Sequence, residues 1–292
     1  MKLKKVACTL LILIGSGFAM ESQNISPNKT VAYKEIEGDS LCLHIFEPAY
    51  INKPAAVIVF FFGGGWTVGD PKQFYQQSAY FASRGIVAIS AEYRIKNIHG
   101  TTPFDCVEDG KSAIRWVREH AKELNIDPDK IVAAGGSAGG HIALCTALIE
   151  GLDNPNENAS ISSVPNAVLA YNPVLDTTNK GYGAKKVENR ETEISPCHHV
   201  KKGLPPMLFF HGKEDTTVPF ENAERFNSLM NAAGNDCNLV AINGVGHGFF
   251  NGSFFRKGSD DQYFNLTMYD SDVFLEKLGY IAGRPTIVKL VN

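Results

Sequence analysis

The stretch "KIVAAGGSAGGHIALCTALIE", residues 130–150, decides the fold, because an apolar strand gives way there to a helix within a few residues. At the junction, "GGSAG" centred on Ser137 has the form G-x-S-x-G. Between a strand and a helix, this spacing places a serine on a turn so tight that large side chains two positions to either side would clash. We therefore interpret Ser137 as a candidate nucleophile whose Oγ is lifted clear of a sheet. A structural serine in a chance match is the alternative.

Strands and helices alternate along the rest of the chain. We expect strands at residues 41–48, 55–62, 85–90, 130–136, 166–173, 206–212 and 237–244, and helices at 72–84, 105–124, 137–150, 219–234 and 260–279. This alternation is typical of an α/β fold with a mostly parallel, doubly wound sheet and helices on both faces. We expect a single domain over residues 20–292, with irregular loops at 151–165 and 176–204 that help to shape a site.

Two polar residues follow the strands that come after Ser137 in the chain. Asp215 lies in "HGKEDTTVP" just past one apolar strand, and His247 lies in "GVGHGF" just past the next. A serine needs a base that is oriented by a third group before it becomes a good nucleophile. The order serine, acid, histidine therefore predicts a catalytic triad of Ser137, Asp215 and His247. Glu214 is the competing acid, and Asp215 is favoured because its shorter side chain stands closer to the following helix.

A run of three glycines follows the most apolar strand, in "VIVFFFGGGWTVGD" at residues 57–70. By itself the run predicts a turn, since glycine is the strongest turn former. Beside a nucleophile, the same run indicates an oxyanion hole, because preorganised N–H groups stabilise the developing negative charge. We expect Gly64, Gly65 and Ala138 to be the donors, the last at a helix N-terminus. Trp66 is a candidate substrate-binding platform for a sugar, or alternatively part of the pocket wall.

Composition and charge exclude several classes of function. The 292 residues carry a net charge of −3, so no nucleic-acid partner is expected. The run Cys197-His198-His199 invites interpretation as a metal site, but no second ligand cluster has matching spacing, so we expect no metal and no cofactor. The cysteines also lack the close spacing of a disulfide scaffold.

The N-terminus carries the pattern of a secretory signal peptide. Lysines within residues 2–5 precede an apolar run at residues 6–14, and residues 17–19 have the small-x-small form of a cleavage site. We therefore expect a signal peptide at residues 1–19, cleavage near Ala19, and a secreted or periplasmic protein. The apolar run is too short for stable membrane insertion. An N-terminal hydrophobic strand is the alternative.

With these motifs together, the chain resembles the α/β-hydrolase superfamily, in particular the esterase and lipase group related to hormone-sensitive lipase. The resemblance rests on "FFGGGW", "SAEYR", "GGSAGGH", "HGKEDTTVP" and "GVGHGF" in this order, across most of residues 30–280. It implies an α/β-hydrolase fold with Ser137, Asp215 and His247 as the triad. Phe62 departs from the group, which usually has a histidine before the glycines, so we expect Phe62 to brace the loop by packing.

A second departure is the short segment before the glycine run. Residues 20–61 hold a polar start and two strands, which leaves little or no N-terminal cap where many lipase-like relatives carry a helical one. An open site on an exported protein favours small-molecule esters or acylated carbohydrates over long-chain lipids. By analogy, this pattern is similar to the secreted acetyl- and feruloyl-type carboxylesterases.

Three hypotheses follow for function. The first is a secreted serine carboxylesterase that hydrolyses short-chain or sugar-linked acyl esters. The second keeps the triad but changes the bond, as in an amidase, an arylformamidase or a peptidase; peptidases with this domain generally carry a large extra domain, for which the length leaves no room. The third is a binding protein on a hydrolase scaffold. Ser137 and His247 argue against the third, and Phe62 is the feature in its favour.

Overall fold

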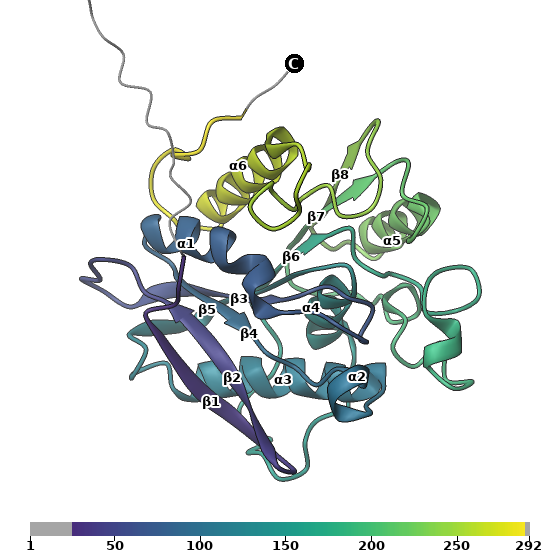
Figure 1. The fold of residues 1–292 in the computed structure, drawn as a ribbon, viewed down its shortest axis with the longest axis horizontal. Coiled ribbons are helices and arrows are strands. Elements are labelled where there is room, and N and C mark those ends of the chain that lie inside the picture. The colour runs from purple at the N-terminus through teal and green to yellow at the C-terminus, as the bar shows by residue number, and fades with distance from the viewer. Residues whose placement is uncertain (1–24, 290–292) are drawn as a thin grey trace, which may run out of the picture.

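The computed structural model describes residues 25–289, and within them eight strands form one sheet in the order β1-β2-β4-β3-β5-β6-β7-β8 (Figure 1). The strands are β1 (Lys29–Ile36), β2 (Asp39–Phe46), β3 (Ala55–Phe61), β4 (Val87–Ala91), β5 (Ile126–Gly136), β6 (Ala167–Tyr171), β7 (Met207–Gly212) and β8 (Cys237–Ile242). The β1–β2 and β2–β4 pairs are antiparallel, and the other pairs are parallel. The prediction of an α/β fold with a mostly parallel sheet is confirmed. The predicted signal peptide lies outside the described residues.

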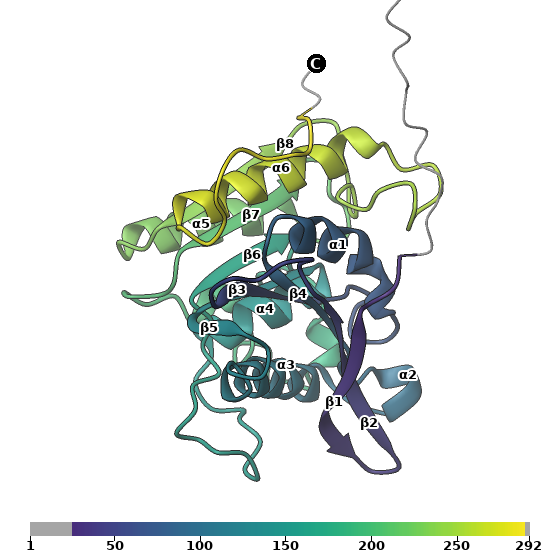
Figure 2. The same ribbon diagram turned by 90° about the vertical axis from the view of Figure 1, so that its left-hand side faces the viewer.

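Helices cover both faces of this sheet. Helices α1 (Tyr75–Ser83) and α6 (Asp261–Lys277) lie on one face, and α3 (Pro103–Glu119) and α4 (Ala138–Leu148) lie on the other (Figure 2). The remaining helices are α5 (Phe220–Ala232), which packs against β7 and β8, and the short η1 (Pro71–Phe74), α2 (Lys96–His99), η2 (Ala184–Lys186) and η3 (Pro196–His198). None of the helices in residues 25–289 combines the length and the apolar character that crossing a bilayer requires.

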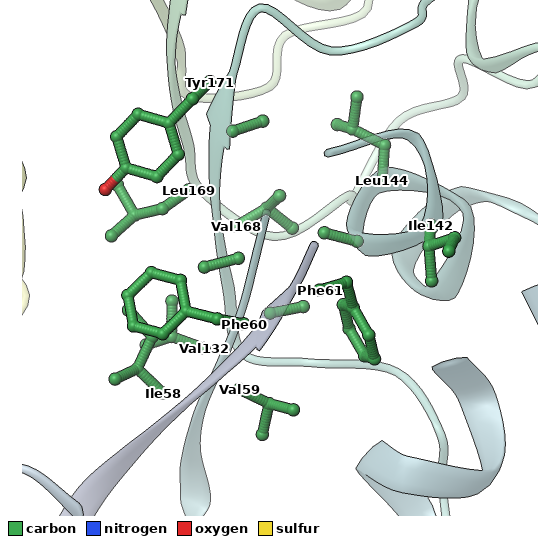
Figure 3. Close-up of a cluster of buried hydrophobic side chains, with 14 of the residues drawn as sticks. Ile58, Val59, Phe60, Phe61, Val132, Ile142, Leu144, Val168, Leu169 and Tyr171 are labelled. Atoms are coloured by element: carbon green, nitrogen blue, oxygen red, sulfur yellow. The ribbon is translucent and has the colours of Figure 1, made fainter. Parts of the chain in front are cut away.

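Successive side chains of β3 point to opposite faces of the sheet and are buried on both. Ile58 and Phe60 point to the same side as Tyr171 of β6, whereas Val59 and Phe61 point to the opposite side, and Phe61 lies near Ile142 and Leu144 of α4 (Figure 3). These side chains are all buried, as expected around a central parallel strand that is covered on both faces. Because β3 and β5 run parallel and are paired, the loops that follow them leave the sheet at the same edge.

The sequence did not predict strand β1. Its residues, KTVAYKEI, mix apolar and charged side chains without a regular pattern, and much of the strand faces solvent at the edge of the sheet. Gly38, with φ 77°, forms the turn that folds β1 back onto β2. Lys34 is buried on the inner face, where its Nζ lies 2.6 Å from Asp109 Oδ1. Residues 25–54 therefore form a hairpin and its connections, with no helix among them.

Helix α3 begins earlier and ends earlier than the predicted range of 105–124. It starts at Pro103, whose fixed φ suits the first helical position. Thr102 and Asp105 form a reciprocal capping box, in which Asp105 Oδ2 accepts the Thr102 N–H at 2.8 Å. These capping interactions position the helix that packs beneath β5.

Candidate active site

Ser137 occupies the turn between β5 and α4 with a strained backbone. Its φ of 53° lies in the left-handed region, which non-glycine residues adopt uncommonly. A Cβ on Gly139 would lie 2.0 Å from the carbonyl oxygen of Phe61, and a Cβ on Gly135 would lie 2.5 Å from the Gly139 backbone. The glycines of G-x-S-x-G are therefore required by sterics, as the sequence predicts, and they hold Ser137 close to the end of β3.

The structure brings the three predicted triad residues into one hydrogen-bonded chain. His247 Nε2 lies 2.9 Å from Ser137 Oγ, and His247 Nδ1 lies 2.7 Å from Asp215 Oδ2. Each residue stands in a loop at the carboxyl end of a strand, β5, β7 or β8. Glu214, the competing acid, is exposed, so Asp215 is the carboxylate that contacts the histidine. This arrangement lets His247 accept a proton from Ser137 while Asp215 orients its ring.

The surroundings of Asp215 favour its ionised form. Burial raises the pKa of Asp215, but hydrogen bonds from His247 and from the backbone N–H groups of Val218 and Thr217 outweigh burial, so the pKa lies below its ordinary value. His211, which the sequence did not single out, is buried beside this carboxylate, with Nε2 3.4 Å from Asp215 Oδ2 and 3.0 Å from the carbonyl oxygen of Val218. Burial lowers the pKa of His211, so it supports the acid as a neutral ring.

The glycine run lines the cavity into which Ser137 opens. Gly64 and Gly65 have positive φ, at 131° and 61°, and a Cβ on Gly64 would lie 1.9 Å from the carbonyl oxygen of Val68. Among residues 25–289, no protein acceptor takes the backbone N–H of Gly64, Gly65 or Ala138. These donors are available to a bound oxyanion, which is the condition that the predicted oxyanion hole requires.

Packing by Phe62 braces the glycine run from the side of β4. The Phe62 ring stacks on Tyr93 with centroids 4.2 Å apart, and the Tyr93 hydroxyl donates a hydrogen bond of 2.7 Å to the carbonyl oxygen of Phe62. A Cβ on Gly69 would lie 2.3 Å from the Phe62 ring, so the loop closes tightly over it. Aromatic packing therefore holds this position, where the group that the chain resembles usually has a histidine.

A pair of buried amide side chains joins the glycine run to the histidine loop. Gln73 Oε1 accepts the N–H of Gly63 at 2.6 Å, and Gln73 Nε2 donates to Asn251 Oδ1 at 2.9 Å. Asn251 Nδ2 in turn donates to the carbonyl oxygen of Gly248, the residue after His247, at 3.0 Å. We call Gln73 and Asn251 the amide bridge. The sequence did not predict it; the position of Asn251, close behind His247, is the one available signal.

The cavity above Ser137 has a volume of about 360 Å³. Besides the glycine run, Ser137, His247 and the amide bridge, its wall contains Val68, Asn172, Tyr182, Thr217, Gly248, Phe250 and Arg256. Trp66 does not line it: the side chain is 1% exposed and packs edge-on against His141 at 5.0 Å. Trp66 therefore presents no open face to a sugar, which corrects its prediction as a platform. Tyr182, 5.7 Å from the Trp66 ring, forms the wall in its place.

The run Cys197-His198-His199, which by its sequence invites interpretation as a metal site, has protein partners for both histidines. His198 Nδ1 lies 2.8 Å from Ser195 Oγ, and His199 Nε2 lies 2.8 Å from the carbonyl oxygen of Thr192. Within residues 25–289, no group of three or more histidine, cysteine, aspartate or glutamate side chains is placed to hold a metal ion. The five cysteines in this part of the chain are unpaired: Cys42, Cys106, Cys145, Cys197 and Cys237.

The chain matches a solved esterase over most of its length. Thermogutta terrifontis esterase 2, solved phosphonylated by cyclosarin, is 45% identical, with a TM-score of 0.83 over 88% of this chain and 96% of that one. The same esterase has been solved with propionate bound and with butyrate bound.

Two curated relatives are more distant. A probable isoprenylcysteine alpha-carbonyl methylesterase of Arabidopsis thaliana is 26% identical over 229 residues, which are 70% of this chain and 48% of the relative. Endo-1,4-beta-xylanase B of Butyrivibrio fibrisolvens is 30% identical over 180 residues, 58% of this chain and 28% of the relative. The chain thus spans about half of the first relative and less of the second. Residues 43–230 match the BD-FAE family, and the chain belongs to this family of α/β-hydrolase esterases related to hormone-sensitive lipase.

Proposed function

We propose that this chain is a serine carboxylesterase that works through an acyl-enzyme. Ser137 Oγ attacks the ester carbonyl carbon while His247 Nε2 takes the hydroxyl proton, and the Asp215 carboxylate stabilises the imidazolium that forms. The observation that carries the proposal is the hydrogen-bonded chain from Ser137 Oγ to Asp215, at the floor of a cavity lined by glycines.

Backbone N–H donors stabilise the tetrahedral intermediate, which then expels the alcohol with the help of His247. The N–H groups of Gly64, Gly65 and Ala138 bind its oxyanion, each contributing about 3 kcal/mol to the transition state. As the C–O bond to the alcohol breaks, His247 gives its proton to the leaving oxygen, and the acyl group stays on Ser137. Water then attacks the acyl-enzyme with His247 as base, which releases the acid and restores the serine.

We propose short-chain or sugar-linked acyl esters, of acetyl or feruloyl type, as the substrates. The hairpin at residues 25–54, where a helical cap would otherwise stand, supports an open site. The propionate- and butyrate-bound forms of the Thermogutta esterase support short acyl groups, and the similarity to a xylanase supports an alcohol that belongs to a plant polysaccharide. The signal-like pattern at residues 1–19 supports secretion or export to a periplasm, which N-terminal sequencing of the mature protein tests.

Active-site labelling tests the mechanism. A fluorophosphonate probe should label the wild-type protein and leave Ser137→Ala unlabelled. Hydrolysis of p-nitrophenyl acetate by Ser137→Ala should fall by at least about 10⁴-fold, because the nucleophile is lost, while its melting temperature stays close to that of the wild type. Turnover retained by a folded Ser137→Ala protein would refute the proposal.

A substrate panel decides which bond is cleaved. Aryl acetates, acetylated xylan, feruloylated sugars and N-formyl aryl amides are compared by kcat/KM with the same preparation of enzyme. We expect the esters to rank above the amides. A preference for the N-formyl amides would replace the esterase with an amidase on the same triad, and a panel without any turnover would favour the binding-protein hypothesis.

A further inference from the structure

A second cleft adjoins the catalytic cavity on the side of the histidine. It has a volume of about 620 Å³ and shares Thr217, His247, Gly248 and Arg256 with the cavity above Ser137. Its other walls are Thr216, Val245, Gly246, Phe249, Lys257, Gly258, Ser259, Asp260 and Tyr263. The cleft is therefore an extension of the site that starts at His247 and runs along the segment before α6.

The chemistry of ester cleavage fixes which part of a substrate enters this cleft. His247 must hand its proton to the leaving oxygen, so that oxygen lies within hydrogen-bond reach of Nε2. The carbonyl oxygen points the other way, to the glycine run, and the glycines of that run do not border the cleft. Atoms attached to the leaving oxygen therefore extend past His247 into the cleft, whereas the acyl group stays in the cavity.

Arg256 stands at the junction of the cavity and the cleft with most of its donors unused. Its Nη1 donates to the carbonyl oxygen of His247 at 3.1 Å. A Cβ on Gly248 would lie 2.9 Å from the same nitrogen, so glycine at this position makes room for the guanidinium. Within residues 25–289, none of the ion pairs shorter than 4 Å involves Arg256. The guanidinium has five N–H donors, and a fork of this kind matches a carboxylate.

The charge around Arg256 favours an anion. Lys257 follows it in the wall of the cleft and adds a second positive charge. The acid in the same wall, Asp260, serves as the N-cap of α6, where its Oδ1 accepts the N–H of Gln262 at 3.0 Å. The wall of the cleft thus holds two positive charges and one negative charge, whereas the whole chain has a net charge of −3.

We propose that this cleft is the subsite for the alcohol part of the ester, and that Arg256 selects alcohols that carry a carboxylate. The proposal rests on the esterase function proposed above and deepens it by naming the substrate class. The carboxylate of the alcohol pairs with the Arg256 guanidinium while the leaving oxygen stays near His247 Nε2. No bond to Arg256 is made or broken, so Arg256 acts on specificity and not on the chemical step.

Matched esters test the proposal. We compare 3-acetoxybenzoate with 3-acetoxybenzamide, which share the acetyl group and differ in the charge of the alcohol. The ratio of their kcat/KM values, charged over neutral, is measured for the wild type, Arg256→Gln and Arg256→Lys. An exposed charge-assisted pair contributes only a modest interaction energy, so we expect Arg256→Gln to lower this ratio by about fivefold at low salt. The ratio for Arg256→Lys should lie between those of the wild type and Arg256→Gln. Added salt should lower the wild-type ratio toward that of Arg256→Gln.

Two controls separate the possible outcomes. Lys122→Gln removes an exposed positive charge at the opposite edge of the sheet and should leave the ratio unchanged. The monophenyl ester of adipic acid, compared with phenyl hexanoate, moves the carboxylate to the acyl side, where Arg256→Gln should have no selective effect. An unchanged ratio in Arg256→Gln, or a selective effect on the adipate ester, overturns the proposal. Failure of all these esters to react, without labelling of Ser137, would instead refute the esterase function itself.

Discussion

The serine turn and the glycine run face each other across one cavity, but they are held in place by different means. Residues 135–139 are fixed by backbone sterics, with a Cβ on Gly139 colliding with Phe61 at 2.0 Å. The glycine run is held instead by side chains, through the stack of Phe62 on Tyr93 and through the amide bridge. The turn is thus held by close backbone contacts with itself and with the end of β3, whereas the run depends also on side-chain contacts that connect it to Tyr93 and to the histidine loop.

This difference has a consequence for how each half responds to substitution. A close-packed turn has one geometry, and any added atom must displace β3 or α4. A loop held by hydrogen bonds can relax when one is removed, because the backbone N–H groups gain freedom without a steric clash. We therefore expect changes at the turn to affect folding and activity together, and changes at the amide bridge to act mainly on kcat.

Among the substitutions that leave the triad side chains intact, Gly139→Ala should have the largest effect. The added Cβ has no room beside the Phe61 carbonyl, so the end of β3 must move, at a cost of about 3 kcal/mol or more. A shift of about 1 Å at the catalytic groups lowers kcat by about 100-fold or more. Thermal denaturation and p-nitrophenyl acetate kinetics measure the two effects on one preparation.

Gly100→Ala is the matched control for this substitution. Gly100 ends α2 with φ 69°, and a Cβ there meets no atom within 4 Å. Its replacement should cost only about 1 kcal/mol, from the left-handed backbone, and leave kcat unchanged. If Gly139→Ala were no more harmful than Gly100→Ala, sterics would not be what defines the serine turn.

Gln73→Ala tests the other half of the comparison. The substitution leaves the Gly63 N–H without its acceptor and frees the glycine run from the histidine loop, so the oxyanion donors lose their alignment. We expect kcat to fall by about 10- to 100-fold, less than the full loss of one donor, with KM changed by less than about threefold. Steady-state kinetics with p-nitrophenyl acetate give both values.

A double-mutant cycle shows whether the amide bridge acts as a unit. Asn251→Ala should lower kcat in the same direction, and the double variant with Gln73→Ala should be no worse than the poorer single variant, because the two side chains share one function. Gln77→Ala, at a buried glutamine of the following helix α1, is the control and should leave kcat unchanged. Additive losses would mean that the two amides act separately.

The alternation of strands and helices made most of the fold predictable. Central strands such as β3 and β6 are buried on both faces and read as continuous apolar runs. Edge strand β1 was missed because half of its residues face solvent, so lysine and glutamate interrupt its apolar pattern. The turn at Gly38 folds β1 onto β2, and the buried contact of Lys34 with Asp109 joins β1 to α3; neither follows from local sequence.

The candidate site also has residues that the sequence singled out and residues that it missed. The sequence singled out Ser137, Asp215 and His247 because each follows a strand in a fixed chain order, and the structure brings their side chains together. It did not find the amide bridge, since Gln73 and Asn251 are far apart in the chain and meet only after folding. The prediction for Trp66 was wrong for a related reason. An aromatic residue beside the glycine loop can either line the cavity or pack behind the loop, and only its burial in the folded chain shows which.

His141 lies between the serine turn and the glycine run, and it makes the free energy of unfolding depend on pH. It lies on α4 just after the serine turn, and it packs against Trp66, the residue that follows the glycine run. Burial lowers its pKa from 6.5 to about 4. The unfolded chain therefore binds a proton between pH 6.5 and 4 that the folded chain does not, so stability falls as pH decreases through this window, by about 3 kcal/mol at its lower end.

Chemical denaturation of His141→Gln between pH 7 and pH 4 measures this effect. The variant should lose less of its unfolding free energy on acidification than the wild type, because glutamine cannot take up a proton, although it can still donate to the carbonyl oxygen of Ile194. His120→Gln, at a half-buried histidine at the end of α3, serves as control and should follow the wild type. Parallel curves for wild type and His141→Gln would show that His141 is not the group that titrates.

Phe62→His should have the smallest effect on kcat. It tests whether the glycine run needs a particular side chain at position 62 to hold it in place. The imidazole can occupy the space of the phenyl ring against Tyr93, but it buries polar nitrogens in an apolar contact, which costs about 1–3 kcal/mol of stability. Since Gly64 and Gly65 keep their backbone geometry, kcat should change by less than about threefold. Phe62→Ala, which removes the ring, should lower kcat further. A rise in kcat for Phe62→His would mean that aromatic packing positions the loop less well than a histidine, and that the run depends on the chemistry of its brace and not only on its shape.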